Sequence, residues 1–140
     1  MQAPFENPTD DIIVEILSHP CRVAVVGCSP DPARDSHRIA RLLMEKGHTV
    51  IPVNPAVDSV FGMPCYPSLT QVPGAVDMVD IFRRSSEVAA IVDEAVAIGA
   101  RIVWMQLGVI DEEAAQRAKR AGLTVVMDRC PAIEYRRLFS

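Results

Sequence analysis

Short apolar runs alternate with amphipathic stretches along almost the whole chain. The apolar runs are rich in Val, Ile and Met, which is typical of strands buried on both faces of a parallel sheet. The stretches between them carry apolar residues at helical spacing. The pattern predicts five strands, at about residues 22–27, 48–53, 76–82, 101–105 and 123–127.

The alternation of strands and helices also predicts how the chain folds. It indicates βαβ crossovers, and therefore a parallel sheet covered by helices on both faces. We predict an α/β, three-layer Rossmann-like fold with a five-stranded parallel sheet in the order 3-2-1-4-5, counted along the chain. At 140 residues the chain is expected to be one domain (1–140), with 1–8 as an irregular lead-in. Pro52 cannot donate a hydrogen bond and belongs near an edge or the end of a strand.

The segment after the first strand predicts an anion site. Gly27 ends the apolar run 23–26, a polar loop with prolines follows, and Asp35 or Ser36 is expected to cap the next helix. A loop of this kind directs free main-chain N–H groups and the positive end of the helix dipole into one space. A phosphate group is the usual ligand of such a space.

Further polar residues follow the other predicted strands, and we expect them at the same edge of the sheet. The full set is Gly27, Cys28, Ser29, Pro30 and Arg34, then Asn54 and Pro55, then Arg83 and Arg84, then Gln106, and finally Arg129 and Cys130. Arginine matches phosphate oxygens well, so four arginines together favour a polyphosphate ligand. The alternative is that exposed strand ends simply carry charged residues, and that Arg129 pairs with Asp128 or a helix C-terminus. Asp80, near the end of the third strand, is expected either to orient an arginine or to cap a loop.

The loop sequence argues against the common dinucleotide and triphosphate sites. The dinucleotide pattern Gly-x-Gly-x-x-Gly lacks its second and third glycines here, and Asn54 stands where an acid would hold the ribose of NAD. NADP would need an arginine at the end of the second strand, and none is there. The Gly-x-x-x-x-Gly-Lys-Ser/Thr pattern of the nucleoside triphosphate loop is also missing.

Composition narrows the functional classes further. A net charge of -4 disfavours general nucleic-acid binding. No apolar stretch approaches the ~20 residues of a membrane helix, and the N-terminus does not read as a signal peptide. The four cysteines are widely spaced, with no Cys-x-x-Cys pair, which favours a reduced, cytoplasmic protein without a zinc site. Cys28 and Cys130 follow strands, where a helix N-terminus can make a thiol reactive; small residues at tight turns are the simpler interpretation.

Several sequence blocks together resemble a known family. The blocks are Val25–Ser29, Arg34–Ser36, Val50–Pro55, Asp77–Arg84, Trp104–Val109 and Met127–Glu134. With them the chain resembles the small stand-alone CoA-binding proteins, which are similar to the nucleotide-binding domain of the succinyl-CoA synthetase α subunit. The resemblance covers about residues 12–138.

The resemblance implies a Rossmann fold that holds coenzyme A. The loop that starts at Gly27 would lie under the pyrophosphate, and Asn54 and Pro55 would meet the nucleotide or its linker. The segment 82–84 would line the adenine and phosphate side, and Met105 and Gln106, near the end of the fourth strand, would face the pantetheine arm. The implied CoA-binding set is Gly27, Cys28, Ser29, Pro30, Arg34, Ser36, Asn54, Pro55, Phe82, Arg83, Arg84, Met105 and Gln106.

The resemblance also bears on catalysis. It implies that the synthetase uses a phosphohistidine in a separate domain, together with a partner subunit, and this chain ends where that domain would begin. None of His19, His37 and His48 matches that histidine. The first hypothesis is therefore a CoA or acyl-CoA binding protein without catalytic machinery of its own. The alternative is a nucleotide- or CoA-dependent transferase or reductase at the same site, with His37, Cys28 or an aspartate as acid or base. The ligand (CoA, acyl-CoA or another adenine nucleotide) and the presence of a protein partner or a homo-oligomer stay open.

Overall fold

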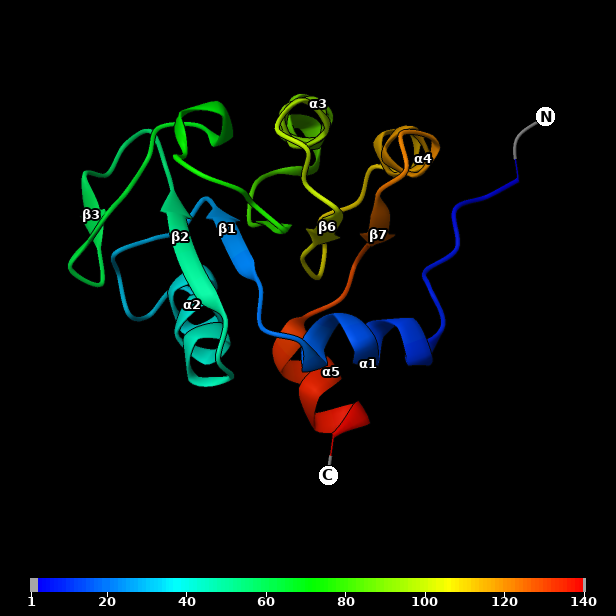
Figure 1. Ribbon diagram of the computed structural model, residues 1–140, viewed down its shortest axis with the longest axis horizontal. Coiled ribbons are helices and arrows are strands. Elements are labelled where there is room, and N and C mark those ends of the chain that lie inside the picture. The colour runs from blue at the N-terminus through cyan, green and yellow to red at the C-terminus, as the bar shows by residue number, and fades with distance from the viewer. Residues whose placement is uncertain (1–2, 140) are drawn as a thin grey trace.

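The central element of the computed structural model, which describes residues 3–139, is a sheet of five parallel strands (Figure 1). In spatial order the strands are β2 (Thr49–Val53), β1 (Arg22–Val26), β5 (Met78–Ile81), β6 (Ile102–Met105) and β7 (Thr124–Val126). One face is covered by α1 (Asp10–Ser18), α2 (Asp35–Glu45) and α5 (Pro131–Leu138), and the other by α3 (Val88–Ala97) and α4 (Glu112–Arg120). The predicted α/β, Rossmann-like fold with five parallel strands is confirmed.

The predicted strand order is wrong in one position. The third strand along the chain, β5, pairs with β1 and β6 rather than outside β2, so the order counted along the chain is 2-1-3-4-5. Pro52 gives the physical reason. Its carbonyl accepts from the Tyr66 amide on the side of β2 that faces away from β1, at 3.1 Å, and its missing N–H falls on the same side. A proline there cannot support a further full strand, so β2 forms the edge of the sheet.

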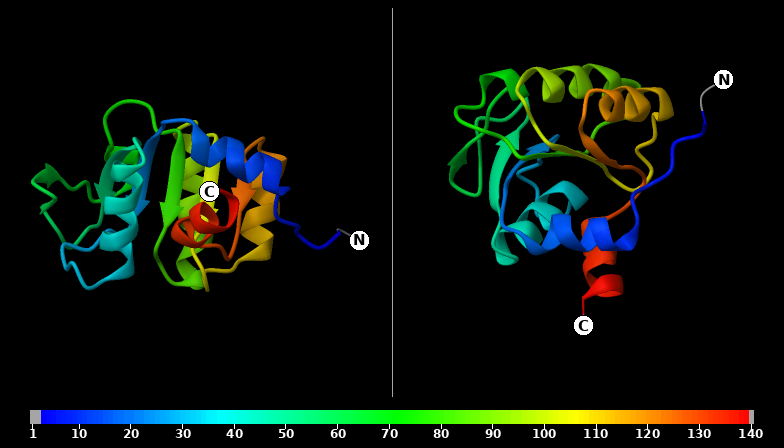
Figure 2. Two further views of the ribbon diagram at one scale, coloured as in Figure 1. Left: turned by 90° about the horizontal axis from the view of Figure 1, so that it is seen from below. Right: turned by 45° about the vertical axis from the view of Figure 1, so that its right-hand side comes forward.

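The segment after β2 covers that edge instead. It forms the short antiparallel hairpin of β3 (Ser59–Val60) and β4 (Met63–Pro64), which lies beyond β2 at one end of the molecule (Figure 2). The Asn54 amide donates to the Tyr66 carbonyl at 2.9 Å, which extends the contact by one more bond. The chain then passes through the single turn η1 (Leu69–Gln71) to reach β5 in the middle of the sheet.

Two separate hydrophobic cores lie on the two faces of the sheet. Side chains alternate between the faces along each strand. In β5, Met78 packs into the core under α1, α2 and α5, while Val79 and Ile81 pack under α3 and α4. Trp104 of β6 is completely buried in the first of these cores. The two cores fix the sheet rigidly, and the loops at its carboxyl edge are therefore held in defined positions.

The residues before α1 have no regular secondary structure but are bound to the body of the protein. The Asn7 side chain donates to the Met127 carbonyl at 2.9 Å and accepts from the Met127 amide at 2.7 Å. It thereby satisfies the main chain just beyond β7. Within residues 3–139, no helix combines the length and the apolar character that crossing a membrane requires.

Candidate ligand site at the carboxyl edge

Three adjoining hollows lie where the strands of the sheet end. The loop hollow, of 540 Å³, lies over the β1–α2 loop and includes Ser29, Arg34 and Asn54 in its lining. The strand-end hollow, of 680 Å³, lies between the segments that follow β5 and β6. The α3 hollow, of 410 Å³, lies between the segment that follows β2 and α3. Arg83 lines all three, so it stands at the point where they meet.

The β1–α2 loop uses almost all of its main-chain N–H groups internally. The amides of Gly27 and Cys28 donate to the Val53 carbonyl, and the Ser29 amide donates to the Ser36 hydroxyl at 3.0 Å. The predicted free donors are therefore not in the loop. Arg34, rather than Asp35 or Ser36, occupies the N-cap position of α2, with no side-chain cap.

The free donors lie instead in the first turn of α2. Within residues 3–139, the main-chain N–H groups of Asp35, Ser36 and His37 donate no hydrogen bond, as expected for an uncapped helix start. The first two of these residues line the loop hollow. The positive end of the α2 dipole and these donors can therefore receive an anion in the loop hollow.

Gly27 holds the ends of β1 and β5 unusually close together. Its φ is +87°, and a Cβ atom added there would lie 2.4 Å from the Phe82 carbonyl oxygen and 2.9 Å from the Arg83 Cδ. Only glycine permits both this backbone conformation and this approach. Because Gly27 has no side chain, the β1–α2 loop can lie directly against Arg83.

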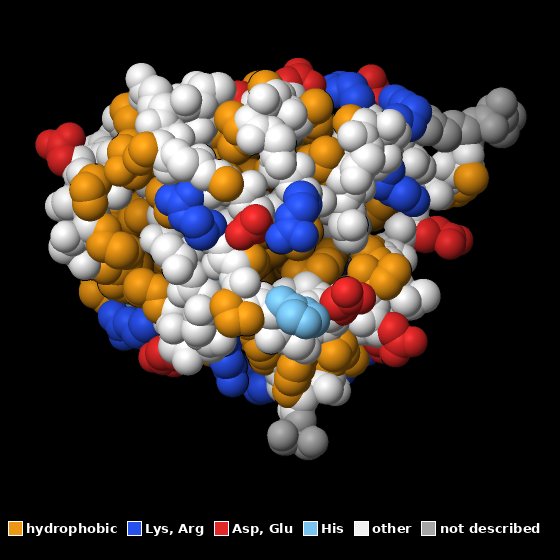
Figure 3. All heavy atoms as spheres, in the orientation of Figure 1, with side chains coloured by type: hydrophobic (Ala, Val, Ile, Leu, Met, Phe, Trp, Pro, Cys, Tyr) orange, Lys and Arg blue, Asp and Glu red, His pale blue; other side chains and the backbone are white. Residues whose placement is uncertain are grey.

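The carboxyl edge carries charges of both signs, because Arg34, Arg83 and Arg84 line the three hollows together with Asp35, Glu87 and Glu94. Arg34 and Arg84 are exposed and form no ion pair with any of residues 3–139. Arg83 donates to the Glu87 carboxylate at 2.7 Å, and this hydrogen bond lowers the pKa of Glu87. Figure 3 shows the opposite, amino edge of the sheet, where basic side chains stand in separate groups among apolar and acidic ones. At the carboxyl edge, a small anionic ligand could use Arg34 and Arg84 without breaking an ion pair within residues 3–139.

Asn54 connects two of the loops that build the site. Its Nδ2 donates to the Cys28 carbonyl at 3.0 Å, and its Oδ1 accepts from the Ala56 amide at 3.0 Å. Its neighbour Pro55 lines the α3 hollow. Asn54 is thus at the predicted place, although its amide is already engaged in shaping the loops.

Most of the predicted site residues come together in these hollows. Those that line at least one of the three are Gly27, Ser29, Pro30, Arg34, Ser36, Asn54, Pro55, Phe82, Arg83, Arg84 and Gln106. Cys28 and Met105 do not. Met105 is fully buried under α3 and α4, because the alternation along β6 turns its side chain away from the face to which Gln106 points.

Two of the residues that the enzyme alternative named, Cys28 and His37, are held in the interior. Cys28 is completely buried, and burial raises the pKa of its thiol to about 12, the opposite of the lowered pKa that a reactive thiol needs. His37 is also buried. One ring nitrogen lies 2.9 Å from the Ser29 carbonyl and the other 3.3 Å from the Arg41 guanidinium, and the ring stacks on Phe61. Both side chains therefore support the loop rather than face the hollows.

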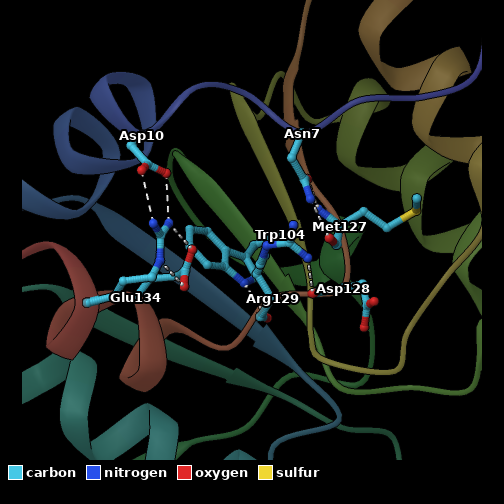
Figure 4. Close-up of polar contacts among 8 residues, drawn as sticks. Asn7, Asp10, Trp104, Met127, Asp128, Arg129 and Glu134 are labelled. Atoms are coloured by element: carbon cyan, nitrogen blue, oxygen red, sulfur yellow. Dashed lines mark hydrogen bonds and ion pairs between the residues drawn. The ribbon is translucent and has the colours of Figure 1, made fainter.

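Arg129 is not part of the site, which corrects the expected group of four arginines. Figure 4 shows it beside Trp104, whose indole donates to the Arg129 carbonyl at 2.9 Å. Its guanidinium donates to the Asp128 carbonyl at 2.8 Å. The hydrogen bond from Arg137 lowers the pKa of Asp10, and the charge of Arg129 adds to this effect. Arg129 thus belongs to the polar cluster around α1 and α5.

Two buried polar residues near the carboxyl edge have oxygens without partners. Neither carboxyl oxygen of Asp80 is hydrogen-bonded, and burial raises the pKa of Asp80 to about 8. The prediction that Asp80 orients an arginine or caps a loop is therefore wrong. The side-chain oxygen of Gln106 is likewise buried and unpaired. Native proteins rarely leave such groups unsatisfied, and no pattern in the sequence indicates that these oxygens lack partners.

Comparison with known proteins identifies the family. Residues 21–136 match the family described as the CoA binding domain. The chain belongs to this family. A protein of Bacillus subtilis called YneT, itself uncharacterized, is 39% identical to this CoA-binding domain over 126 residues, which are 90% of this chain and 93% of YneT. The predicted resemblance is confirmed.

Two further relatives are similar to this CoA-binding domain, one over nearly its own whole length and the other over a small part of its own. The structure of a hypothetical protein from Pyrococcus horikoshii OT3 is 37% identical, covers 100% of this chain and 99% of that one, and superimposes with a TM-score of 0.92. An ADP-forming acetate–CoA ligase of Archaeoglobus fulgidus is 28% identical over 127 residues. These cover 84% of this chain but only 18% of the ligase, so the domain corresponds to a small part of that enzyme.

Proposed function

We propose that this protein binds CoA or an acyl-CoA at the carboxyl edge of its sheet and has no catalytic machinery of its own. One observation supports the proposal above others. In a chain of the CoA-binding domain family, Arg34, Arg83 and Arg84 and the free amides of α2 surround adjoining hollows. CoA carries a pyrophosphate and a 3′-phosphate, which need several positive groups in one place. Since CoA is used inside cells, the proposal also places the protein in the cytoplasm.

The geometry suggests how the phosphates would be shared. The first turn of α2 and Arg34 adjoin the loop hollow and would receive the pyrophosphate. Arg83 and Arg84 line the strand-end hollow and would receive the other phosphate. Glu87 at present pairs with Arg83, so a phosphate would compete with a single carboxylate for that guanidinium. The half-buried ring of Phe82 adds apolar surface to both hollows.

The enzyme alternative gains no support from two of the residues that it named, and Asp35, an aspartate that lines the hollows, is paired with Arg38. Cys28 and His37 are enclosed and hydrogen-bonded or desolvated where they stand. A binding role requires only the hollows and the charges around them. We therefore favour a protein that holds CoA or an acyl-CoA.

Ligand titration tests the proposal directly. CoA, acetyl-CoA, ADP and NAD would be compared by calorimetry and by thermal unfolding. A ligand at a hundred times its dissociation constant adds about 2.7 kcal/mol to the free energy of unfolding, so CoA compounds should raise the melting temperature clearly and NAD should not. Absence of any effect from CoA and every acyl-CoA would contradict the proposal.

Arg83 offers a residue-level test with a matched control. Charge-assisted hydrogen bonds contribute roughly 1.5–3 kcal/mol, so Arg83→Ala should weaken CoA binding by about tenfold or more. Arg101→Ala removes an arginine at the opposite edge, where it pairs with Asp77 at 3.3 Å, and should leave the affinity unchanged. If Arg83 holds the 3′-phosphate, the loss is larger for CoA than for dephospho-CoA. Equal losses would assign it to the pyrophosphate instead.

A further inference from the structure

A fourth, smaller cavity adjoins the strand-end hollow. It measures 180 Å³ and lies between α2 and α5. Asp35, Gln106 and Leu107 line both spaces, so the two are neighbours. Most of the remaining lining is apolar and comes from Ile39, Cys130 and Ile133. The strand-end hollow is lined by four charged side chains, whereas this cavity has only two, Asp35 and Arg38, which pair with each other, and is otherwise mainly apolar.

Gln106 stands at the junction with an unused hydrogen-bonding group. Its side chain is only 7% exposed, and its oxygen has no partner among residues 3–139. A side-chain amide carries both a donor and an acceptor, and it can turn to present either one to a ligand. An unpaired buried group costs stability unless something else satisfies it. A ligand with amide or carbonyl groups would do so.

The beginning of α5 explains why the cavity is open. Cys130 occupies the N-cap position of α5, and Pro131 follows at the first helical position. The small Cys130 side chain lies in the lining, where a larger residue would occupy the space. Leu107 and Ile133 are 57% and 41% exposed, which leaves apolar surface at the edge of the cavity.

We propose that this cavity, called the acyl cavity below, takes the thiol end of bound CoA together with a short acyl group, and that Gln106 hydrogen-bonds the ligand at its entrance. The inference rests on the proposed function. The arm of CoA carries two amides before its thiol, and a thioester adds a carbonyl. These groups match the free amide of Gln106, and the apolar lining matches the acyl carbons.

The volume limits the length of the acyl group. An apolar cavity of ~150 Å³ is large enough for a molecule the size of benzene. The acyl cavity, at 180 Å³, therefore accepts a few carbon atoms beside the sulfur and not a fatty acyl chain. Each buried methylene should strengthen binding by roughly fourfold until the space is full.

A chain-length series measures this limit. Acetyl-CoA, propionyl-CoA and butyryl-CoA should bind the unchanged protein progressively more tightly than CoA, by roughly fourfold per added carbon. Octanoyl-CoA should bind no more tightly than butyryl-CoA. A flat series, or an affinity that keeps rising to octanoyl-CoA, would overturn the inference.

Filling the cavity provides the matched variants. Cys130→Leu should lower the affinity for butyryl-CoA about tenfold and that for CoA less than threefold. Cys21→Leu makes the same change in a separate hollow of 590 Å³ at the opposite edge of the sheet and should change neither. Gln106→Leu removes the amide but retains a side chain of similar size, and it should weaken both ligands. Equal behaviour of the two cysteine variants, with both folded by circular dichroism, would refute the assignment.

A chemical measurement on the unchanged protein avoids reliance on folded variants. With CoA disulfide, a Cys130 thiolate attacks one sulfur, the S–S bond breaks, a mixed disulfide forms and CoA leaves as its thiolate. Peptide mass spectrometry should find this product at Cys130 at least tenfold faster than at Cys21, since Cys28 and Cys65 are buried and Cys21 lies at the other edge. Excess acetyl-CoA should slow the reaction at Cys130 only. Labelling of Cys21 at the same rate would overturn the inference.

The outcomes separate the two proposals. If no CoA compound binds the unchanged protein, the proposed function itself fails. If CoA binds but chain length, Cys130→Leu and disulfide exchange all show no preference, only the acyl cavity is wrong.

Discussion

The two edges of the sheet treat their buried polar groups in opposite ways. At the amino edge, His48 is buried, its Nδ1 accepts from the Cys21 amide at 3.2 Å, and its Nε2 lies 2.9 Å from the Tyr135 hydroxyl. That hydroxyl donates in turn to the Leu17 carbonyl at 3.1 Å. Because Nδ1 is an acceptor, Nε2 carries the proton and donates to the tyrosine oxygen. The chain of hydrogen bonds is complete, and it joins α1, α5 and the start of β2.

Toward the carboxyl edge, in contrast, buried polar groups lack hydrogen-bond partners within residues 3–139. Asp80 and Gln106 lie on the same face of neighbouring strands and leave three oxygens unpaired. Burial also shifts the pKa values of His48 and Asp80 in opposite directions. It lowers the pKa of His48, whose neutral form is hydrogen-bonded, and raises the pKa of Asp80 to about 8 because its charged form has no partner. Satisfied polar groups thus lie at the amino edge, and unsatisfied ones lie toward the edge at which we propose that the ligand binds.

Glycines at the two edges give the largest expected contrast. Gly27→Ala would place a Cβ 2.4 Å from the Phe82 carbonyl, and we expect it to cost about 3 kcal/mol or more of unfolding free energy. Gly122 at the amino edge has a similar φ of +94°, but no atom within 4 Å of the added Cβ. Gly122→Ala should cost only about 1 kcal/mol, from the backbone conformation alone. Urea unfolding of both variants measures the difference, and equal costs would show that the close approach at Gly27 is unimportant.

Asp80→Asn should change how stability depends on pH. The folded pKa of about 8 lies above the ordinary aspartate pKa of 3.8, so between these values the folded protein binds more protons than the unfolded chain, and stability falls as pH rises. From about pH 6.5 to 8.5 the unchanged protein should lose on the order of 2 kcal/mol more than Asp80→Asn does. His48 titrates in both proteins, so its contribution cancels in the difference between the two pH profiles. Parallel pH profiles of the two proteins would mean that Asp80 is ionised or paired in solution.

Tyr135→Phe tests the amino edge and has the smallest expected effect. Removing the hydroxyl leaves the His48 Nε2–H and the Leu17 carbonyl without a partner, which should cost about 1 to 2 kcal/mol in urea unfolding. The affinity for CoA should not change, because Tyr135 lines none of the hollows at the carboxyl edge. A loss of affinity with unchanged stability would reverse the comparison between the two edges.

The sequence by itself determined the elements and most of the site. Apolar runs and helical spacing are local properties, so they located the five strands and predicted a layered α/β fold. The residues after each strand then predicted most of the hollow lining, from Gly27 to Gln106, because parallel strands end at one edge. Alternation along a strand could also have shown that Met105 and Gln106 point to opposite faces, so that only one of them could reach the ligand.

The tertiary structure decided everything that depends on which distant segments meet. The place of β5 in the sheet follows from the contact of Pro52 with Tyr66, although the missing N–H of Pro52 was already a sign that β2 is an edge strand. The free amides lie in α2 rather than in the loop because Val53 and Ser36 engage the loop amides. Arg129 lies outside the site because its guanidinium donates to the Asp128 carbonyl and its charge acts on Asp10 of α1. That the oxygens of Asp80 and Gln106 are unpaired can be seen only when the surrounding segments are in place. Periodicity is encoded within a few neighbouring residues, whereas a hydrogen-bond partner is supplied by whichever segment folding brings alongside.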